Sequence, residues 1–365
     1  MVGEVLVIGG GIIGLAIALE LKQQGVAVTV LSRDFKQAAA HAAAGMLAPQ
    51  AEALPPSPFL DLCLRSRALY PSWTQHLEEQ TGLSTGYWAC GILQPWYEAA
   101  IHGKRSAEAE AEHWLDRTAI HQHQPGLSTA VGGGYWFPLD AQVDNRALAI
   151  ALWQAAQAAG IDIQEGIPAT SLKTQASRVT AVITSTGEWQ ADHYVLAGGA
   201  WSAEVLPVPV SPQKGQMLSV QVPSGEALSL QQVLFGSEIY MVPRRDGLIV
   251  LGATSEWVGF SPGNTPMGVN TLLAAAIRLY PAIADYPIQE FWWGFRPTTP
   301  DELPLLGSSP YNNLTLATGH HRNGILLAPI TARLITDWIV QGQADPLLDY
   351  FHYARFQLKD GISGL

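Results

Sequence analysis

Val5-Leu6-Val7-Ile8-Gly9-Gly10-Gly11-Ile12-Ile13-Gly14 is the stretch of this chain that decides its fold. The apolar, mostly β-branched run at 5–8 predicts a short buried strand. Small and aliphatic residues then recur at helical spacing from Leu15 to Leu21, and Gly25 ends that pattern. A second apolar run, at 26–31, predicts another strand. These elements predict a strand, a tight glycine turn and a helix at the start of a βαβ unit.

Gly9, Gly11 and Gly14 form a G-x-G-x-x-G pattern in that turn. In a βαβ unit the first glycine permits the turn, the second lets the backbone approach a phosphate, and the third lets helix and strand pack closely. A dinucleotide pyrophosphate then lies at the N-terminus of the helix. We therefore predict dinucleotide binding here, with a purely structural glycine turn as the alternative.

The end of the second strand normally identifies the nucleotide, because an acid there accepts hydrogen bonds from the adenosine ribose. Ser32 and Arg33 occupy that position in this chain. An arginine suits a ribose 2′-phosphate, which would favour NADP, and a solvated Arg33 is equally compatible with the sequence. These two residues alone leave FAD and NADP open.

Composition bounds the class of protein. With 365 residues, 48% apolar and 14% charged, the chain can bury a substantial core in one large or two interleaved domains. A formal charge of -11 argues against nucleic acid or an anionic membrane as a partner. The longest apolar stretch, 324–340, contains Arg333 and Asp337 and predicts a buried helix rather than a membrane span.

Two further features point to an ordinary cytoplasmic protein. The start of the chain lacks a charged-then-apolar leader, so we expect a cytoplasmic location. Cys63 and Cys90 form neither a disulfide framework nor a metal-binding spacing. We expect both to be small core residues and no metal site.

The rest of the chain alternates between two patterns. Residues 161–163, 179–184 and 189–196 are expected to extend the parallel sheet, whereas the short strand-like pieces in 86–138 and 208–293 predict a separate layer. Helices are expected at 60–81, 108–117, 140–160 with Asp144 as N-cap, 271–279 and 326–341.

Four motifs follow the glycine turn in order: Ala42-Ala43-Ala44-Gly45-Met46-Leu47, Tyr240-Met241-Val242-Pro243-Arg244, Phe291-Trp292-Trp293-Gly294-Phe295-Arg296-Pro297 and Gly319-His320-His321-Arg322-Asn323-Gly324-Ile325-Leu326-Leu327-Ala328-Pro329. Together with residues 8–14 they resemble the FAD-dependent D-amino acid oxidase family, and within it the glycine oxidases of thiamine biosynthesis. The likeness runs from about residue 5 to residue 339.

The resemblance implies an α/β fold with non-covalently bound FAD. A Rossmann-like FAD-binding domain, formed by 1–85, 140–207 and 295–365, would be interleaved with a smaller α+β antiparallel-sheet substrate domain, formed by 86–139 and 208–294. Beyond the glycine turn, the implied FAD contacts are Ile12, Ile13, Ser32, Arg33, Ala39, Ala40, Ala44, Gly45, Met46, Ala169, His320, His321, Arg322, Asn323, Gly324, Ile325 and Leu326.

The resemblance also implies a substrate site in which Arg296 binds a carboxylate, Tyr240 lies beside it and Arg322 is a second substrate-side residue. A guanidinium holds a carboxylate through two hydrogen bonds, which agrees with this role. The alternatives are an internal ion pair of Arg296 with Asp301 or Glu302, and a Tyr240 that only packs at a strand end.

Fixing the carboxylate would place the α-carbon to lose a hydride to the flavin, and this chemistry requires no catalytic acid or base. The histidines at 320–321 are therefore expected to pack in the glycine turn. Ser32 departs from the family's ribose-binding acid, and Ser255 stands where glycine oxidases often have methionine.

The expected reaction is oxidative deamination of glycine, sarcosine or small D-amino acids to an imine, with O2 reduced to H2O2. The imine would hydrolyse to glyoxylate and ammonia or feed thiazole synthesis, with a thiazole synthase as partner and a homotetramer as the assembly. A D-amino acid dehydrogenase or a sarcosine oxidase-like enzyme is one alternative. A non-catalytic NADP- or FAD-binding protein, resting on Ser32 and Arg33, is the other.

Overall fold

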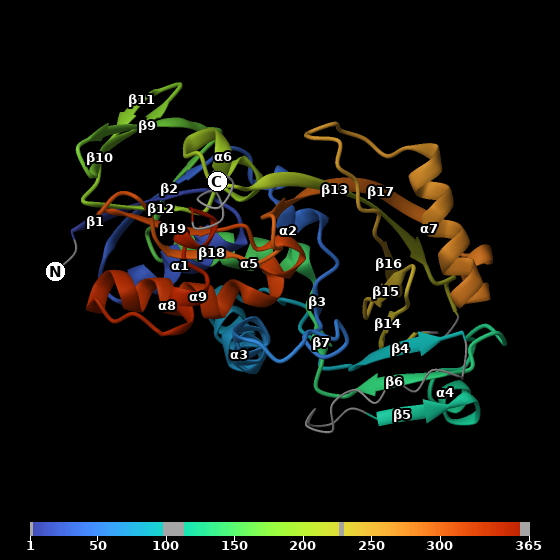
Figure 1. Cartoon of the computed structure of the whole chain (residues 1–365). Helices are drawn as coiled ribbons and strands as arrows, with labels where there is room; N and C mark the ends of the chain where they lie inside the picture. The colour runs from blue at the N-terminus through green and yellow to red at the C-terminus, as the bar shows by residue number, and fades with distance from the viewer. Residues whose placement is uncertain (1–2, 98–112, 226–229, 358–365) are drawn as a thin grey trace, which may run out of the picture.

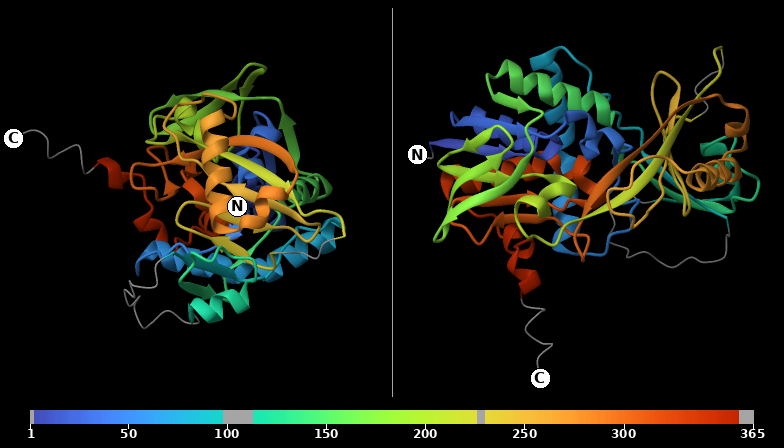
Figure 2. Two further views of the ribbon diagram at one scale, coloured as in Figure 1. Left: turned by 90° about the vertical axis from the view of Figure 1, so that its right-hand side faces the viewer. Right: turned by 90° about the horizontal axis from the view of Figure 1, so that it is seen from above.

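The structure is a computed structural model that describes residues 3–97, 113–225 and 230–357. A six-stranded and an eight-stranded sheet dominate it (Figure 1). The long strands β13 (Ser211–Gln221) and β17 (Ile288–Thr298) belong to the eight-stranded sheet and run towards the six-stranded one. The right-hand view of Figure 2 shows the same two-part arrangement from above.

The six-stranded sheet grows from the predicted N-terminal strand. That strand is β1 (Glu4–Ile8), and its side chains alternate: Val5 and Val7 face a helical core, while Leu6 and Ile8 enter a second core on the other face. The order is β18 (Leu305–Ser308), β19 (Leu314–Thr318), β12 (His193–Leu196), β1, β2 (Ala27–Ser32) and β8 (Asp162–Glu165). All neighbouring pairs are parallel except β18 with β19.

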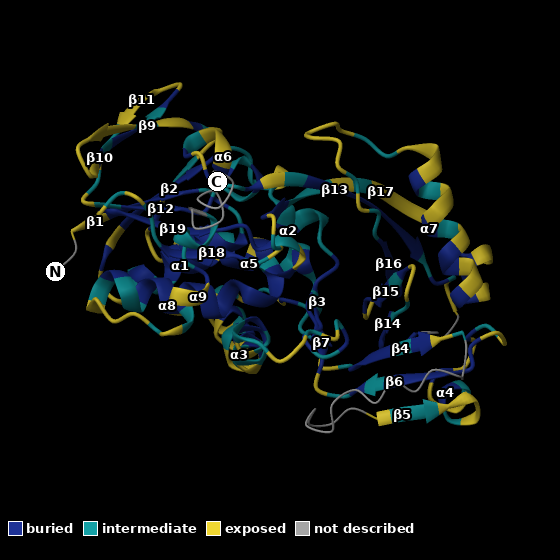
Figure 3. Cartoon of the chain, viewed as in Figure 1, coloured by how far each residue is buried: buried dark blue, intermediate teal, exposed yellow. Residues whose placement is uncertain are grey.

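Helices cover one face of this sheet. Figure 3 shows the buried character of α1, which agrees with a helix packed between the sheet and other helices. The predicted apolar helix is also buried along its length. The four main helices are α1 (Ile12–Gln23), α3 (Pro58–Thr81), α5 (Asn145–Ala158) and α8 (Gly324–Gln341).

The caps of these helices explain their ends. Ser57 accepts a hydrogen bond from the backbone N–H of Leu60 and starts α3, and the left-handed Gly82 ends it. Asp144 caps α5 as predicted, so the helix begins after that cap and not at residue 140. In the described part of the chain no helix is both long and apolar enough to cross a membrane.

Residues 179–184 do not extend the parallel sheet, so that prediction is wrong. They lie in a three-stranded antiparallel sheet of β9 (Ala169–Gln175), β10 (Arg178–Thr184) and β11 (Gly187–Trp189). Only residues 176–177 and 185–186 connect these strands, and a parallel crossover needs a far longer connection. This small sheet packs on the face of the six-stranded sheet opposite the helices.

The predicted helix at 108–117 is wrong over its last part. Residues 113–116 form β5 (His113–Asp116), which pairs with β6 (Gly133–Phe137); residues 108–112 lie outside the described part of the chain. The helix α4 (Arg117–His123) starts only after Asp116, because the Asp116 carboxylate accepts a hydrogen bond from the N–H of Ala119.

The eight-stranded sheet carries α7 (Pro266–Leu279) on one face. Its strands in order are β17, β13, β16 (Leu248–Gly252), β15 (Tyr240–Pro243), β14 (Val233–Phe235), β4 (Ile92–Trp96), β6 and β5. Its members come from the two chain segments expected to form the substrate domain, although β17 continues past residue 294. The division into two interleaved domains stays a proposal.

Short elements complete the connections. They are η1 (Phe35–Gln37), α2 (Ala39–Ala42), β3 (Met46–Leu47), β7 (Ala141–Gln142), η2 (Gly199–Trp201), α6 (Ser202–Val205), η3 (Pro281–Asp285), η4 (His321–Asn323), α9 (Leu347–Tyr350) and α10 (Ala354–Gln357). In the alanine-rich segment around residue 40 the helix α2 is only a single turn.

Candidate active site

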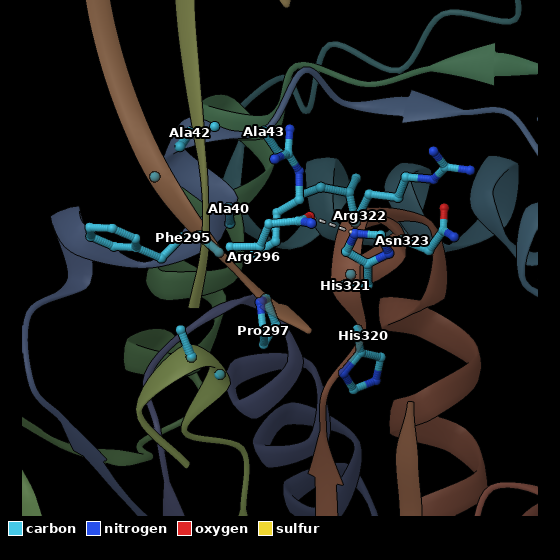
Figure 4. A pocket seen from close by; sticks show the side chains of 18 of the residues that line it. Ala40, Ala42, Ala43, Phe295, Arg296, Pro297, His320, His321, Arg322 and Asn323 are labelled. Carbon is cyan, nitrogen blue, oxygen red and sulfur yellow. Dashed lines mark hydrogen bonds between the residues drawn. The ribbon is translucent and has the colours of Figure 1, made fainter. Parts of the chain in front are cut away.

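A cavity of about 460 Å³ is lined by both large sheets. The six-stranded sheet contributes the glycine turn at 9–13 and the loop 320–325, and the eight-stranded sheet contributes residues of β13, β16 and β17. Figure 4 shows Arg296 and Pro297 of β17 beside the loop that carries His320 to Asn323. Motifs far apart in the sequence therefore meet around one space.

The glycine turn has the form that a phosphate group requires. Gly9 adopts φ +123°, and a Cβ there would lie 2.3 Å from the carbonyl oxygen of Ala197. At Gly11 the nearest atom to an added Cβ is 3.8 Å away, which leaves the backbone open towards the cavity. The N-terminus of α1 follows directly and has no side-chain cap. Its backbone N–H groups and helix dipole suit an anion.

Ser32 and Arg33 lie at the same end of the cavity. Ser32 is buried against the turn, since a Cβ at Gly10 would lie 2.6 Å from the Ser32 Cβ. Arg33 forms an ion pair with Glu204, and its guanidinium lies 5.4 Å from the ring centroid of Trp201. The Arg33 charge, which could have favoured a 2′-phosphate, is therefore already in contact with the Glu204 carboxylate and the Trp201 ring.

The small-residue segment is fixed through its carbonyl groups. The buried Arg244 donates from Nη2 to the Ala44 carbonyl oxygen at 2.9 Å and from Nη1 to the Gln142 side chain at 2.6 Å. The Trp292 indole N–H donates to the Ala42 carbonyl oxygen at 3.2 Å. These long-range contacts hold Ala44, Gly45 and Met46 in the cavity wall.

Arg296 lines the cavity and forms no ion pair with a described carboxylate. Its Nη1 donates to the carbonyl oxygen of Thr254 at 3.1 Å, and among the described residues no carboxylate lies within ion-pair distance of it. Asp301 instead pairs with Arg355 at 2.8 Å, and Glu302 lies 3.6 Å from the ring of His321. The alternative of an internal ion pair between Arg296 and either acid is therefore wrong.

Tyr240 lies next to Arg296. The Tyr240 hydroxyl donates to the Met217 sulfur at 3.3 Å. Burial raises the pKa of Tyr240, while the nearby Arg296 guanidinium opposes that rise. The hydroxyl therefore stays protonated at neutral pH and can donate to a ligand. Ser255 also lines the cavity, so the end that holds Tyr240 combines a thioether with a hydroxyl.

The two loop histidines are neutral near pH 7. Burial lowers the pKa of His320 to about 3 and, together with the charges of Arg296 and Arg322, lowers that of His321 to about 4. His320 hydrogen-bonds Thr331 at 3.2 Å, and His321 hydrogen-bonds Gln213 at 3.0 Å. Both rings are held by neighbouring side chains, as expected for packing residues.

Sequence reasoning missed Glu52, a buried acid in the cavity wall. Its carboxylate lies 3.3 Å from Arg322 Nε and 3.5 Å from the Asn323 side-chain nitrogen. Burial raises the pKa of Glu52, and Arg322 opposes this. The sequence gives little signal for it, because Glu52 follows Ala48-Pro49-Gln50-Ala51 and lies outside the motifs quoted above.

Three predicted cofactor residues lie outside the cavity lining. Gly14 packs behind the turn, where a Cβ would lie 1.9 Å from the Gly9 carbonyl oxygen. Ala169 is the first residue of β9 and its side chain is buried in the core, and Leu326 is buried in α8, where its carbonyl accepts a hydrogen bond from the Ser66 hydroxyl. The other predicted residues line the cavity: Gly9, Gly11, Ile12, Ile13, Ser32, Arg33, Ala39, Ala40, Ala44, Gly45, Met46, Tyr240, Arg296, His320, His321, Arg322, Asn323, Gly324 and Ile325.

A glycine turn at an uncapped helix N-terminus, opening on a cavity between the two large sheets, is typical of a dinucleotide-binding protein. The comparison with known proteins specifies it further. The chain belongs to the family of FAD dependent oxidoreductases, whose model matches residues 4–338. This membership confirms the predicted family, fold class and FAD cofactor, and it leaves the NADP reading unsupported.

Individual relatives agree with this family. The bifunctional protein ThiO/ThiG of Trichormus variabilis is 60% identical over 98% of this chain, and the match covers 56% of that protein. The glycine oxidase of Bacillus licheniformis is 32% identical, covering 92% of this chain and 93% of that one. The glycine oxidase structure from Geobacillus kaustophilus has a TM-score of 0.89 at 32% identity, covering 97% and 99%. The chain spans about half the length of the ThiO/ThiG relatives.

Proposed function

We propose that this chain oxidises glycine, and with it sarcosine or small D-amino acids, to the corresponding imine with FAD as cofactor and O2 as the electron acceptor. The observation that carries the proposal is Arg296, which faces the cavity without a carboxylate partner among the described residues. The relatives named glycine oxidase, matched along nearly their whole length, support glycine as the substrate.

The proposed FAD site uses both helix N-termini at the cavity. The turn at 9–13 would hold the pyrophosphate, residues 32–33 the adenosine, and residues 44–46 with 320–325 the flavin ring. FAD would accept the hydride that the substrate loses from its α-carbon. Arg322 supports the proposed FAD site less than the other residues do, because its side chain is half exposed and paired with Glu52.

The chain's own residues bind and orient the substrate. Arg296 would hold the carboxylate through two charge-assisted hydrogen bonds, and the protonated Tyr240 would donate a third. Fixing the carboxylate would restrict where the α-carbon lies in the cavity, and such positioning lowers the barrier. The imine would leave for hydrolysis to glyoxylate and ammonia, while the two electrons and two protons removed from the amine would reduce O2 to H2O2 by way of the FAD.

Oxygen consumption and peroxide formation test this function. The purified protein is mixed with glycine, sarcosine, D-alanine or acetate, and O2 and H2O2 are followed together. We expect stoichiometric H2O2 from the three amines and none from acetate. Reduction of a quinone dye without O2 consumption would instead support a D-amino acid dehydrogenase, and no turnover of glycine would remove the substrate proposal.

We also propose that a thiazole synthase receives the imine, that the chain forms a homotetramer and that it works in the cytoplasm. The relatives named bifunctional ThiO/ThiG, which extend beyond the matched part, support a connection between the two activities. A pull-down from cell extract that does not enrich a thiazole synthase would argue against the partner. A monomer mass in light scattering would argue against the tetramer.

A further inference from the structure

Besides Arg296, the cavity wall contains a second charged group, Glu52, which lies in the turn between β3 and α3. Its side chain lines the cavity and is only 7% exposed. Burial removes the water that solvates a carboxylate, and hydrogen-bond or ion-pair partners must replace it. A buried carboxylate that lines a cavity is therefore a candidate for binding a ligand. The mechanism proposed above makes no use of this group.

The turn that carries Glu52 is stabilised by a second buried acid, Asp140. The Asp140 carboxylate is fully buried and accepts hydrogen bonds from the backbone N–H of Ala51 at 2.8 Å and of Gln50 at 3.2 Å. Arg67 pairs with Asp140 at 2.6 Å. The backbone on both sides of residue 52 is therefore constrained, with Ala53 in the left-handed region at φ +55°. This arrangement fixes the backbone from which the Glu52 side chain extends.

The partners of Glu52 leave one of its oxygens available. Arg322 and Asn323 both approach Oε2, at 3.3 and 3.5 Å, and among the described residues no hydrogen bond or ion pair reaches Oε1. Arg322 is itself 48% exposed, so solvent screens this ion pair. A carboxylate with one free oxygen beside a cavity can accept a cationic donor.

Glu52 and Arg296 line the same cavity, together with Tyr240 and Arg322. The charges of Arg296, Arg322 and Glu52 all act on the pKa of the Tyr240 hydroxyl, which agrees with this shared location. The cavity therefore presents both an unpaired guanidinium and a carboxylate. An α-amino acid carries the complementary pair, a carboxylate and an ammonium, on one carbon.

We propose that Glu52 accepts a hydrogen bond from the amino group of the substrate, so that Arg296 and Glu52 together recognise the two ends of an amino acid. The inference rests on the proposed amino acid oxidase function. Arg322 is then a positioning residue that holds Oε2, and Asp140 is a positioning residue that holds the turn. The pair would select amino acids over carboxylic acids that lack the amine.

The test compares a ligand with the amino group and one without it. Holoenzyme of wild type and Glu52→Gln is assayed for the KM of glycine and for the inhibition constant of acetate, which offers only the carboxylate. We expect Glu52→Gln to raise the KM of glycine by about tenfold or more, because a charge-assisted hydrogen bond is lost. The inhibition constant of acetate should stay within about twofold of wild type, since Arg296 is untouched.

Controls separate this role from a structural one. Glu188→Gln makes the same change in an exposed ion pair with Lys173, far from the cavity, and should change neither constant. If Glu52→Gln fails to fold or to retain FAD, Glu52→Asp keeps the charge on a shorter side chain and should raise only the glycine KM. Equal shifts for glycine and acetate, or no shift for glycine, would overturn the inference. A wild type that does not oxidise glycine would instead overturn the proposed function.

Discussion

A side chain at Gly215 would collide with Arg296: a Cβ built there lies 2.7 Å from both Nη1 and Nη2 of the arginine. Gly215 is in β13 and pairs with Gly294 in β17, two residues before Arg296. The glycine thus leaves the space in the cavity wall that the guanidinium occupies. The position of the carboxylate-binding group depends on the absence of a side chain on the neighbouring strand.

Gly215→Ala should therefore displace Arg296 without disturbing the distant glycine turn. We expect the KM of glycine to rise about tenfold, a loss of about 1.4 kcal/mol of binding free energy, while the visible flavin spectrum of the purified protein stays the same. Steady-state kinetics and absorbance measure both. An unchanged KM would show that the guanidinium does not need its present position.

Arg296→Ala removes the proposed carboxylate anchor altogether. The KM of glycine should rise by at least on the order of tenfold, because losing a hydrogen bond to a charged group costs roughly 1.5–3 kcal/mol. The control is Arg278→Ala, an arginine that is 55% exposed and paired with Glu238. If both variants keep the wild-type KM, Arg296 is not part of the substrate site.

Arg33→Ala should weaken FAD binding only slightly, because the Arg33 side chain is partly exposed and its charge is already paired with Glu204. Arg33 and Glu204 are 36% and 45% exposed, and an exposed ion pair of this kind contributes only about 0–1 kcal/mol. Equilibrium dialysis with FAD and with NADP, on wild type and variant, measures the outcome. NADP binding by wild type that disappears in the variant would revive the NADP reading of Ser32 and Arg33.

The two loop histidines should make the fold less stable in acid. Their folded pKa values, about 3 for His320 and about 4 for His321, lie below the ordinary value of 6.5. Between pH 6.5 and 4 the unfolded chain binds protons that the folded chain excludes, so the stability that each histidine contributes is complete above pH 6.5 and falls with pH, by up to about 1.4 kcal/mol per pH unit.

Asp140 acts in the opposite direction, since burial raises its pKa to about 6. The informative comparison is therefore between wild type and His321→Asn, a replacement that tolerates the left-handed backbone at φ +48°. Urea unfolding at pH 7 and pH 5 should show a smaller loss of unfolding free energy in the variant. Identical losses in both proteins would mean that His321 is not held neutral by the fold.

Local patterns predicted the parts of the fold that local sequence controls. The apolar run from Val5 to Ile8, the glycines of the first turn and the Asp144 cap all act within a few residues, and the strand, turn and cap are where the sequence predicts them. The antiparallel sheet around 179–184 and the strand at 113–116 depend on which neighbour a strand finds, and sequence periodicity does not encode that choice.

The site shows the same division. The cofactor contacts predicted in the glycine-rich motifs were Gly9, Gly11 to Gly14 and His320 to Leu326. All of them line the cavity except Gly14 and Leu326. Glu52 was missed because its placement depends on Asp140, which is 89 residues from the Ala51 N–H that it holds. Ala169 was carried over from a family motif, yet its backbone is part of the small antiparallel sheet and its side chain lies in the core.

An anaerobic titration of the purified protein with glycine, followed through the visible flavin absorbance, tests the central claim most directly. We expect the absorbance to bleach as glycine is added and to recover when air is admitted, which would establish flavin, substrate and oxygen reactivity in one experiment. A flavin that stays oxidised at saturating glycine would contradict glycine oxidation while leaving the fold and the FAD family membership intact.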